Sequence, residues 1–75
     1  MKENSKDIFR IFGENIHYLR NERSMTLEES SVITGIRKEY LQKIENGVAR
    51  RVSASHIFLF ANAFNVEPLE IVKNL

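Results

Sequence analysis

Residues 26–47, with the sequence TLEESSVITGIRKEYLQKIENG, decide the fold of this chain, because they predict two short helices joined by a tight turn. Thr26 can cap the free backbone N–H groups of a helix that begins near Leu27, and Glu29 completes a capping box. Gly35 can adopt the positive φ that ends such a helix. We therefore expect the first helix to span residues 27–34.

A second helix is predicted for residues 37–46. Four apolar residues recur at helical spacing along one side of it: Ile36, Tyr40, Leu41 and Ile44. Asn46-Gly47 is a strong C-terminal stop. Two helices of about two to three turns each, separated by a short turn that contains glycine, fit the helix-turn-helix motif.

The outer face of this second helix has the chemistry needed to read DNA. A rotation of about 100° per residue places Lys38, Glu39, Gln42 and Lys43 opposite the apolar side. Lysine can donate to guanine, glutamine can bond adenine, and glutamate can accept from cytosine in the major groove. The alternative stays open that these residues form an ordinary solvated face, with an i,i+4 ion pair between Glu39 and Lys43.

The charge of the chain is unevenly distributed. Residues 37–51 hold five basic and two acidic residues, for a net charge of +3, whereas residues 1–36 and 52–75 each have a net charge of −1. A positive centre of this kind is typical of a surface that meets a phosphate backbone. Arg50 and Arg51 lie in a predicted loop, from which they could reach phosphates or a minor groove; a pair of solvated charges is the alternative.

The remaining helices are expected at residues 6–22, 54–64 and 68–74. The first has a core-facing stripe formed by Phe9, Phe12, Ile16 and Leu19. Ser53 is the predicted cap of the next helix, and Pro68 suits the first turn of the last one. The sequence thus predicts an all-α fold, a compact arrangement of five helices in a single domain over residues 1–75.

Composition argues against several other classes of protein. The chain has no cysteine, and its two histidines, His17 and His56, lack partners at the spacing of a metal site or a catalytic triad. There is no glycine-rich phosphate loop, signal peptide or apolar stretch long enough to span a bilayer. We therefore expect a cytoplasmic protein that is not an enzyme and has no metal, no cofactor, no small-molecule ligand and no membrane partner.

Several motifs, in this order and spacing, resemble those of the phage repressor and Cro type of helix-turn-helix domain, the XRE family. They are Leu19-Arg20, Thr34-Gly35-Ile36, Ile44-Glu45-Asn46-Gly47 and the run from Phe60 to Val66, FANAFNV. The resemblance extends from about residue 12 to residue 72. It implies a repressor-type fold and a sequence-specific DNA-binding regulator of transcription.

The resemblance also implies roles for individual residues. Arg20 and Glu45 match the ion pair that holds the recognition helix in the family. The resemblance and the outward face of the helix together predict five contacts to bases: Arg37, Lys38, Glu39, Gln42 and Lys43. The expected contacts to the DNA backbone are Thr26, Leu27, Tyr40, Asn46, Arg50 and Arg51. The ring of Tyr40 is expected to pack at the junction of the two motif helices, with its hydroxyl free to reach a phosphate.

This sequence departs from the family pattern at several positions. Leu27 stands where the family often has glutamine, and Arg37 replaces the usual serine or threonine cap. Ser30 occupies a position usually held by a core aliphatic residue, while Val32 and Ile33 lie where polar residues are common. We expect either a slight rotation of the first motif helix or an exposed apolar spot on it.

An apolar surface near the C-terminus predicts a homodimer. Leu59 and Leu69 stand where the family usually has polar residues, and Phe58 lies beside them. A two-fold partner would bury them and pair two recognition helices on double-stranded DNA with an inverted-repeat operator. Leu59 could instead be a scattered surface residue. The alternative function is a helix-turn-helix fold that acts mainly as a protein-interaction module, in the manner of an antitoxin or anti-repressor.

Overall fold

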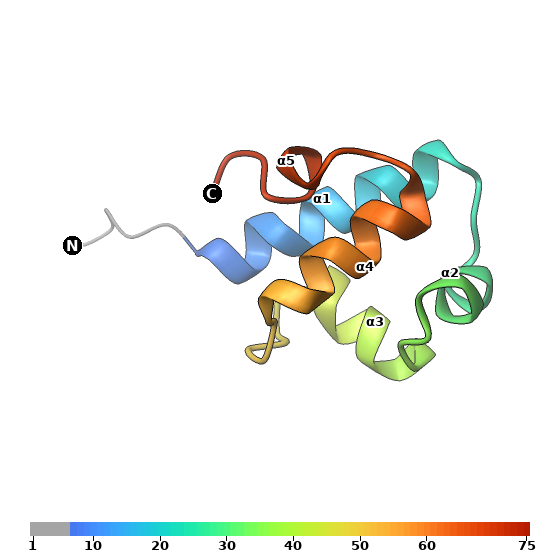
Figure 1. Ribbon diagram of the computed structural model, residues 1–75. Coiled ribbons are helices and arrows are strands. Elements are labelled where there is room, and N and C mark those ends of the chain that lie inside the picture. Colours follow the sequence, from blue (N-terminus) through green and yellow to red (C-terminus); the bar gives the residue numbers. More distant parts are fainter. Residues whose placement is uncertain (1–6) are drawn as a thin grey trace.

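Five helices follow one another along residues 7–75, the part of the chain that the computed structural model describes (Figure 1). They are α1 (Ile8–Glu22), α2 (Leu27–Thr34), α3 (Lys38–Glu45), α4 (Ala54–Phe64) and α5 (Pro68–Ile71). The described residues contain no strand, so the prediction of an all-α fold is confirmed. None of these helices has the length and hydropathy that a bilayer crossing requires.

Local capping signals place most helix ends. The Thr26 hydroxyl accepts a hydrogen bond from the Glu29 N–H, and the Glu29 carboxylate accepts one from the Thr26 N–H, so α2 has the predicted capping box. Gly35 ends α2 with a φ of 76°. Helix α1 begins at Ile8 because the Asp7 carboxylate accepts from the Arg10 N–H, whereas the predicted start at Lys6 lies outside the described residues.

Two predicted boundaries need correction. Helix α3 covers Lys38–Glu45 rather than 37–46, because Arg37 has an extended backbone and Asn46 is the C-cap. Helix α5 ends at Ile71 rather than at residue 74. The Asn15 amide donates to the carbonyls of Ile71 (3.0 Å) and Lys73 (2.8 Å), so these groups are satisfied without further helical turns.

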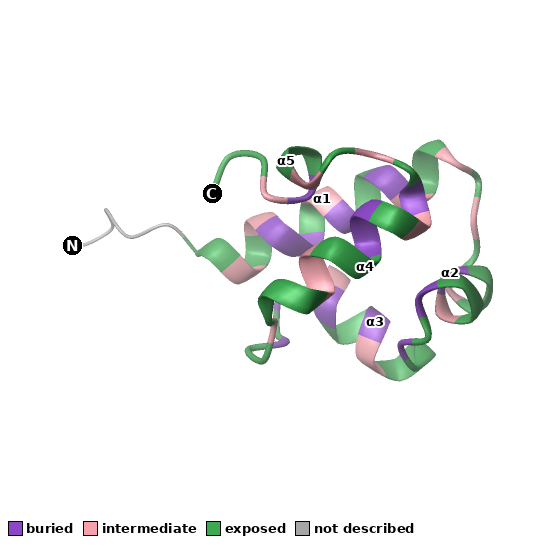
Figure 2. Cartoon of the chain, in the orientation of Figure 1, coloured by how far each residue is buried: buried purple, intermediate pink, exposed green. Residues whose placement is uncertain are grey.

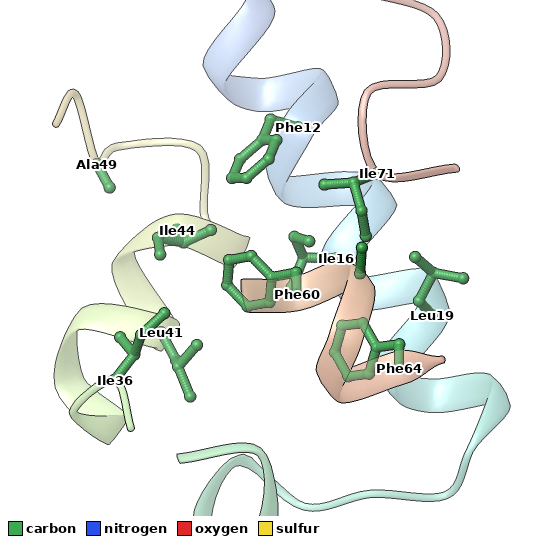
Figure 3. Packing of buried hydrophobic residues seen from close by; sticks show 11 residues of the cluster. Phe12, Ile16, Leu19, Ile36, Leu41, Ile44, Ala49, Phe60, Phe64 and Ile71 are labelled. Carbon is green, nitrogen blue, oxygen red and sulfur yellow. The ribbon is translucent and has the colours of Figure 1, made fainter. Parts of the chain in front are cut away.

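The core lies between α1, α3 and α4, and α5 closes one end of it (Figure 3). Its largest fully buried side chains include Phe60 and Phe64 of α4, whose rings stack at 5.9 Å, and Phe12 of α1 meets Phe60 edge-on at 6.0 Å. Phe9, predicted to face the core, is only half-buried, since α1 extends beyond the core at that end.

Two of the unusual residues of α2, Val32 and Ile33, form an exposed apolar spot. Ser30 is buried at the position where the family usually has a core aliphatic residue, and its hydroxyl lies 3.7 Å from the sulfur of Met25. Val32 is 82% exposed and Ile33 is 45% exposed. The outer surfaces of α2 and α3 are thus largely open to solvent, as Figure 2 shows.

Helices α1 and α3 approach each other at two glycines. A Cβ atom on Gly13 would collide with the backbone carbonyl oxygen of Ile44 and lie 2.9 Å from that of Glu45. A Cβ on Gly47 would lie 2.9 Å from the Arg10 Cα. The missing side chains therefore let the C-terminal end of α3 rest directly on α1, a contact that periodicity alone does not reveal.

Gly13→Ala should destabilise the protein although alanine favours a helix by about 1 kcal/mol. The new methyl group meets backbone atoms that cannot rotate away, and we expect a loss of about 3 kcal/mol in the free energy of unfolding, measured with urea. Gly35→Ala is the control, because it has open space but a positive φ and should cost about 1 kcal/mol. A Gly13→Ala variant as stable as the wild type would contradict the proposed close contact.

Candidate nucleic-acid interface

Helix α3 presents a polar surface over a buried apolar side. Leu41 and Ile44 are each only 1% exposed. The residues expected to meet bases are all exposed: Arg37, Lys38, Glu39, Gln42 and Lys43. Arg37, Glu39 and Lys43 also line a shallow hollow beside Tyr40. The structure therefore brings the predicted base-contacting residues together on one accessible surface.

A buried ion pair fixes this helix to α1. The Arg20 guanidinium donates through Nε to Oε2 of Glu45 at 2.7 Å and through Nη2 to Oε1 at 2.9 Å. Its Nη1 donates to the backbone carbonyl of Met25 at 2.8 Å. The Glu45 side chain is only 3% exposed and that of Arg20 12%. One guanidinium thus joins α1, the segment before α2 and the end of α3.

His17 is a third member of this cluster, to which the sequence analysis assigned no role beyond the absence of metal or triad partners. Its Nδ1 lies 2.8 Å from Oε1 of Glu45, and its Nε2 lies 2.9 Å from the Asn21 amide nitrogen. The neutral tautomer with a proton on Nδ1 satisfies both contacts. The available signal was its position three residues before Arg20, on the same side of the helix.

The electrostatics of the cluster favour a charged Glu45. Burial raises the pKa of the Glu45 carboxyl, but the hydrogen bonds from Arg20 and His17, together with the positive charge of Arg20, outweigh burial, so its pKa lies below the usual value. The Arg20 pKa is raised, first by the hydrogen bond to Glu45. Charge and geometry therefore agree that the pair stays ionised near neutral pH.

The five cations of residues 37–51 differ in their partners. Lys38 Nζ lies 3.1 Å from Oε2 of Glu28 on α2. Arg50 lies 3.6 Å from the Asp7 carboxylate, and its guanidinium is 4.7 Å from the centre of the Phe9 ring. Within residues 7–75, the remaining three form no ion pair and are exposed: Arg37, Lys43 and Arg51.

Some expected backbone contacts are engaged within the protein. The Tyr40 hydroxyl, expected to be free, donates to the Arg51 carbonyl at 2.7 Å, and its ring lies 6.3 Å from that of His56 at the start of α4. The Thr26 N–H is taken by Glu29, and Leu27 is half-buried against the core. Asn46 is exposed at the end of α3. The loop after α3 is consequently held from two sides, by Tyr40 and through Arg50.

Comparison with known proteins identifies the family. A family model described as "Helix-turn-helix" matches residues 16–71, which include all of α2 and α3. The chain belongs to the XRE-type helix-turn-helix family. Members of this family are DNA-binding proteins rather than enzymes, and the chain is accordingly a DNA-binding regulator of transcription.

Two solved structures share this architecture. The restriction-modification controller protein C.AhdI from Aeromonas hydrophila has a TM-score of 0.78 and 28% identity, over 84% of this chain and 94% of that one. A hypothetical transcription factor, NHTF, from Neisseria has a TM-score of 0.80 and 18% identity, over 96% of this chain and 84% of that one, and shows the fold alone. No curated protein sequence matches the chain.

The Glu45 cluster predicts loss of stability in acid. The pKa of the Glu45 carboxyl is lower in the folded state than in the unfolded state, so the carboxyl stabilises the folded state at any pH above its pKa in the unfolded state. This contribution disappears as the pH falls through the pKa of the folded state. Urea unfolding between about pH 7 and pH 3 should show a smaller loss of stability for Glu45→Gln than for the wild type. Glu39→Gln, an exposed change on the same helix, should retain the wild-type loss; equal losses in all three proteins would contradict this role of Glu45.

Proposed function

We propose that this protein is a homodimeric, sequence-specific regulator that inserts α3 into the major groove at each half of an inverted repeat. The observation that supports this best is the row of five exposed polar side chains at the N-cap and along α3, a helix whose C-terminal end is held by the ion pair of Arg20 and Glu45. A rigid helix is needed because a base contact depends on placing a side chain within hydrogen-bond distance. The similarity to a restriction-modification controller protein supports a regulatory role of that kind.

Base reading would be shared among the exposed side chains of α3 and of Arg37, its N-cap residue. Arg37, Lys38 and Lys43 can donate to guanine, Gln42 can bond adenine, and Glu39 can accept from cytosine. Contacts to phosphates would position the helix, and Asn46 and Arg51 are the best placed candidates, because both are exposed at or after its C-terminal end.

Dimerisation would use the exposed apolar residues of α4 and α5. Phe58 is 57% exposed, Leu59 39% and Leu69 75%. A second copy related by a two-fold axis would cover this surface and set two recognition helices about 34–36 Å apart. Binding of two half-sites would then supply affinity that one small domain lacks.

A protein-interaction module is the competing function, and one observation favours it. The exposed Val32 and Ile33 form an apolar spot on α2, outside the proposed dimer surface. A protein partner could cover such a spot. This function would not require the α3 surface to discriminate between DNA sequences.

In vitro selection from random duplex DNA tests the proposed function. We expect enrichment of an inverted repeat with half-sites about one helical turn apart, bound at least about 10³-fold more tightly than a scrambled duplex. Light scattering at tens of micromolar should give the mass of a dimer, and Leu69→Glu should reduce both this mass and the affinity. Failure to enrich any sequence would reject the DNA reader in favour of the protein-interaction module, and a monomeric mass would reject the dimer.

Substitutions on α3 and in the following loop should differ in their effects. Lys43→Ala should cost about 1–3 kcal/mol on the selected operator and little on scrambled DNA, because a base contact is lost. Arg51→Ala should weaken binding to both duplexes and reduce the slope of log K against log salt by roughly 0.9, because a phosphate contact is lost. Equal losses on both duplexes for both variants would contradict this division of roles.

A further inference from the structure

Among the base-contacting candidates on α3, only Lys38 forms an ion pair with an acidic side chain of another helix, within the described part of the chain. Its ammonium group donates to Oε2 of Glu28 at 3.1 Å. The two residues are ten positions apart in sequence, and the hydrogen bond connects α3 to α2. Both side chains are largely exposed, 47% for Lys38 and 68% for Glu28. The contact therefore lies on the surface that the proposed function assigns to DNA.

The first turn of α2 is chemically unsuited to binding a phosphate in this protein. Thr26 and Glu29 satisfy each other's backbone N–H groups through the capping box. Glu28 adds a second carboxylate, whose pKa is lowered first by a hydrogen bond to its own backbone N–H and then by Lys38. An approaching phosphate would meet two carboxylates at a helix end that otherwise attracts anions.

We propose that Glu28 is a specificity-determining residue that keeps Lys38 from contributing to non-specific DNA binding. This proposal rests on the DNA-reading function proposed above. Glu28 acts by holding the ammonium group of Lys38 and by repelling a phosphate that would replace it. Its effect is greatest on DNA that offers Lys38 no suitable base.

Bases and phosphates differ in how they compete with Glu28. A lysine ammonium has three N–H donors, so Lys38 can keep one hydrogen bond to Glu28 while donating the other two to O6 and N7 of a guanine. Those acceptors are uncharged, and the carboxylate does not repel them as it repels a phosphate. A correctly placed guanine is thus compatible with the Glu28 contact, whereas a phosphate requires that contact to break. The resulting selectivity arises from disfavouring the wrong ligand.

A matched pair of variants separates this contact from simple removal of charge. Glu28→Gln and Glu29→Gln each remove one negative charge from the first turn of α2, and glutamine preserves the capping box at residue 29. Of these two carboxylates, Glu28 forms the ion pair with Lys38 and Glu29 does not. Binding to the selected operator and to a scrambled duplex would be measured for both variants across a salt series.

Glu28→Gln should tighten binding to the scrambled duplex roughly five- to tenfold more than Glu29→Gln does, with a salt slope steeper by about 0.9, because Lys38 gains a phosphate contact. Its affinity for the operator should change less, so the ratio of the two affinities falls. Adding Lys38→Met to both variants should abolish the difference between them.

The outcomes distinguish the two proposals. If the wild type selects an operator but Glu28→Gln and Glu29→Gln have the same affinities and salt slopes, the role of Glu28 is overturned and the DNA-reading function stands. A difference that persists after Lys38→Met also overturns it, since Glu28 would then act without Lys38. If the wild type selects no operator, the proposed function fails first.

Discussion

The bidentate contact between Arg20 and Glu45 is the interaction on which the rest of the structure depends. A carboxylate with only 3% exposure is stable when charged only if its oxygens are paired, and Arg20 with His17 supplies the donors. Gly13 makes the contact possible, because its missing side chain lets the end of α3 lie against α1. The position of α3 is therefore determined at its C-terminal end, and its polar face points outward as a consequence.

Local chemistry explains why much of the fold was predictable. The capping box of Thr26 and Glu29, the positive φ of Gly35 and the stop at Asn46 act within a few residues of themselves, so the sequence alone places α2 and α3 to within a residue. The end of α5 depends instead on Asn15, more than fifty residues away along the chain. The sequence around residue 71 does not reveal this contact with Asn15, so the apolar pattern predicts a helix that is three residues too long.

At the candidate site, the sequence likewise predicts the types of residue but not their tertiary contacts. Charge counting identifies residues 37–51 as basic, but it treats their five cations alike. The structure separates Lys38, held by Glu28, and Arg50, held by Asp7 and Phe9, from the others. These three partners lie on α2 and at the start of α1, and each is ten or more residues away in sequence from the cation that it contacts. The resemblance to the family motif predicted the pair of Arg20 and Glu45, but it did not predict the contact of His17 with Glu45.

The buried ion pair at the C-terminal end of α3 restricts the orientation of the helix more than it adds to net stability. Apolar residues of similar volume could stabilise the contact between α1 and α3 equally well, because desolvation offsets much of the attraction between buried charges. They would leave the rotation of α3 about its axis less restricted. The fork of Arg20 donates to the two oxygens of Glu45 in one orientation, which restricts the rotation of α3 and with it the directions of Gln42 and Lys43. The base reading proposed for α3 requires that restriction, since a small rotation of the helix would carry each donor out of hydrogen-bond range.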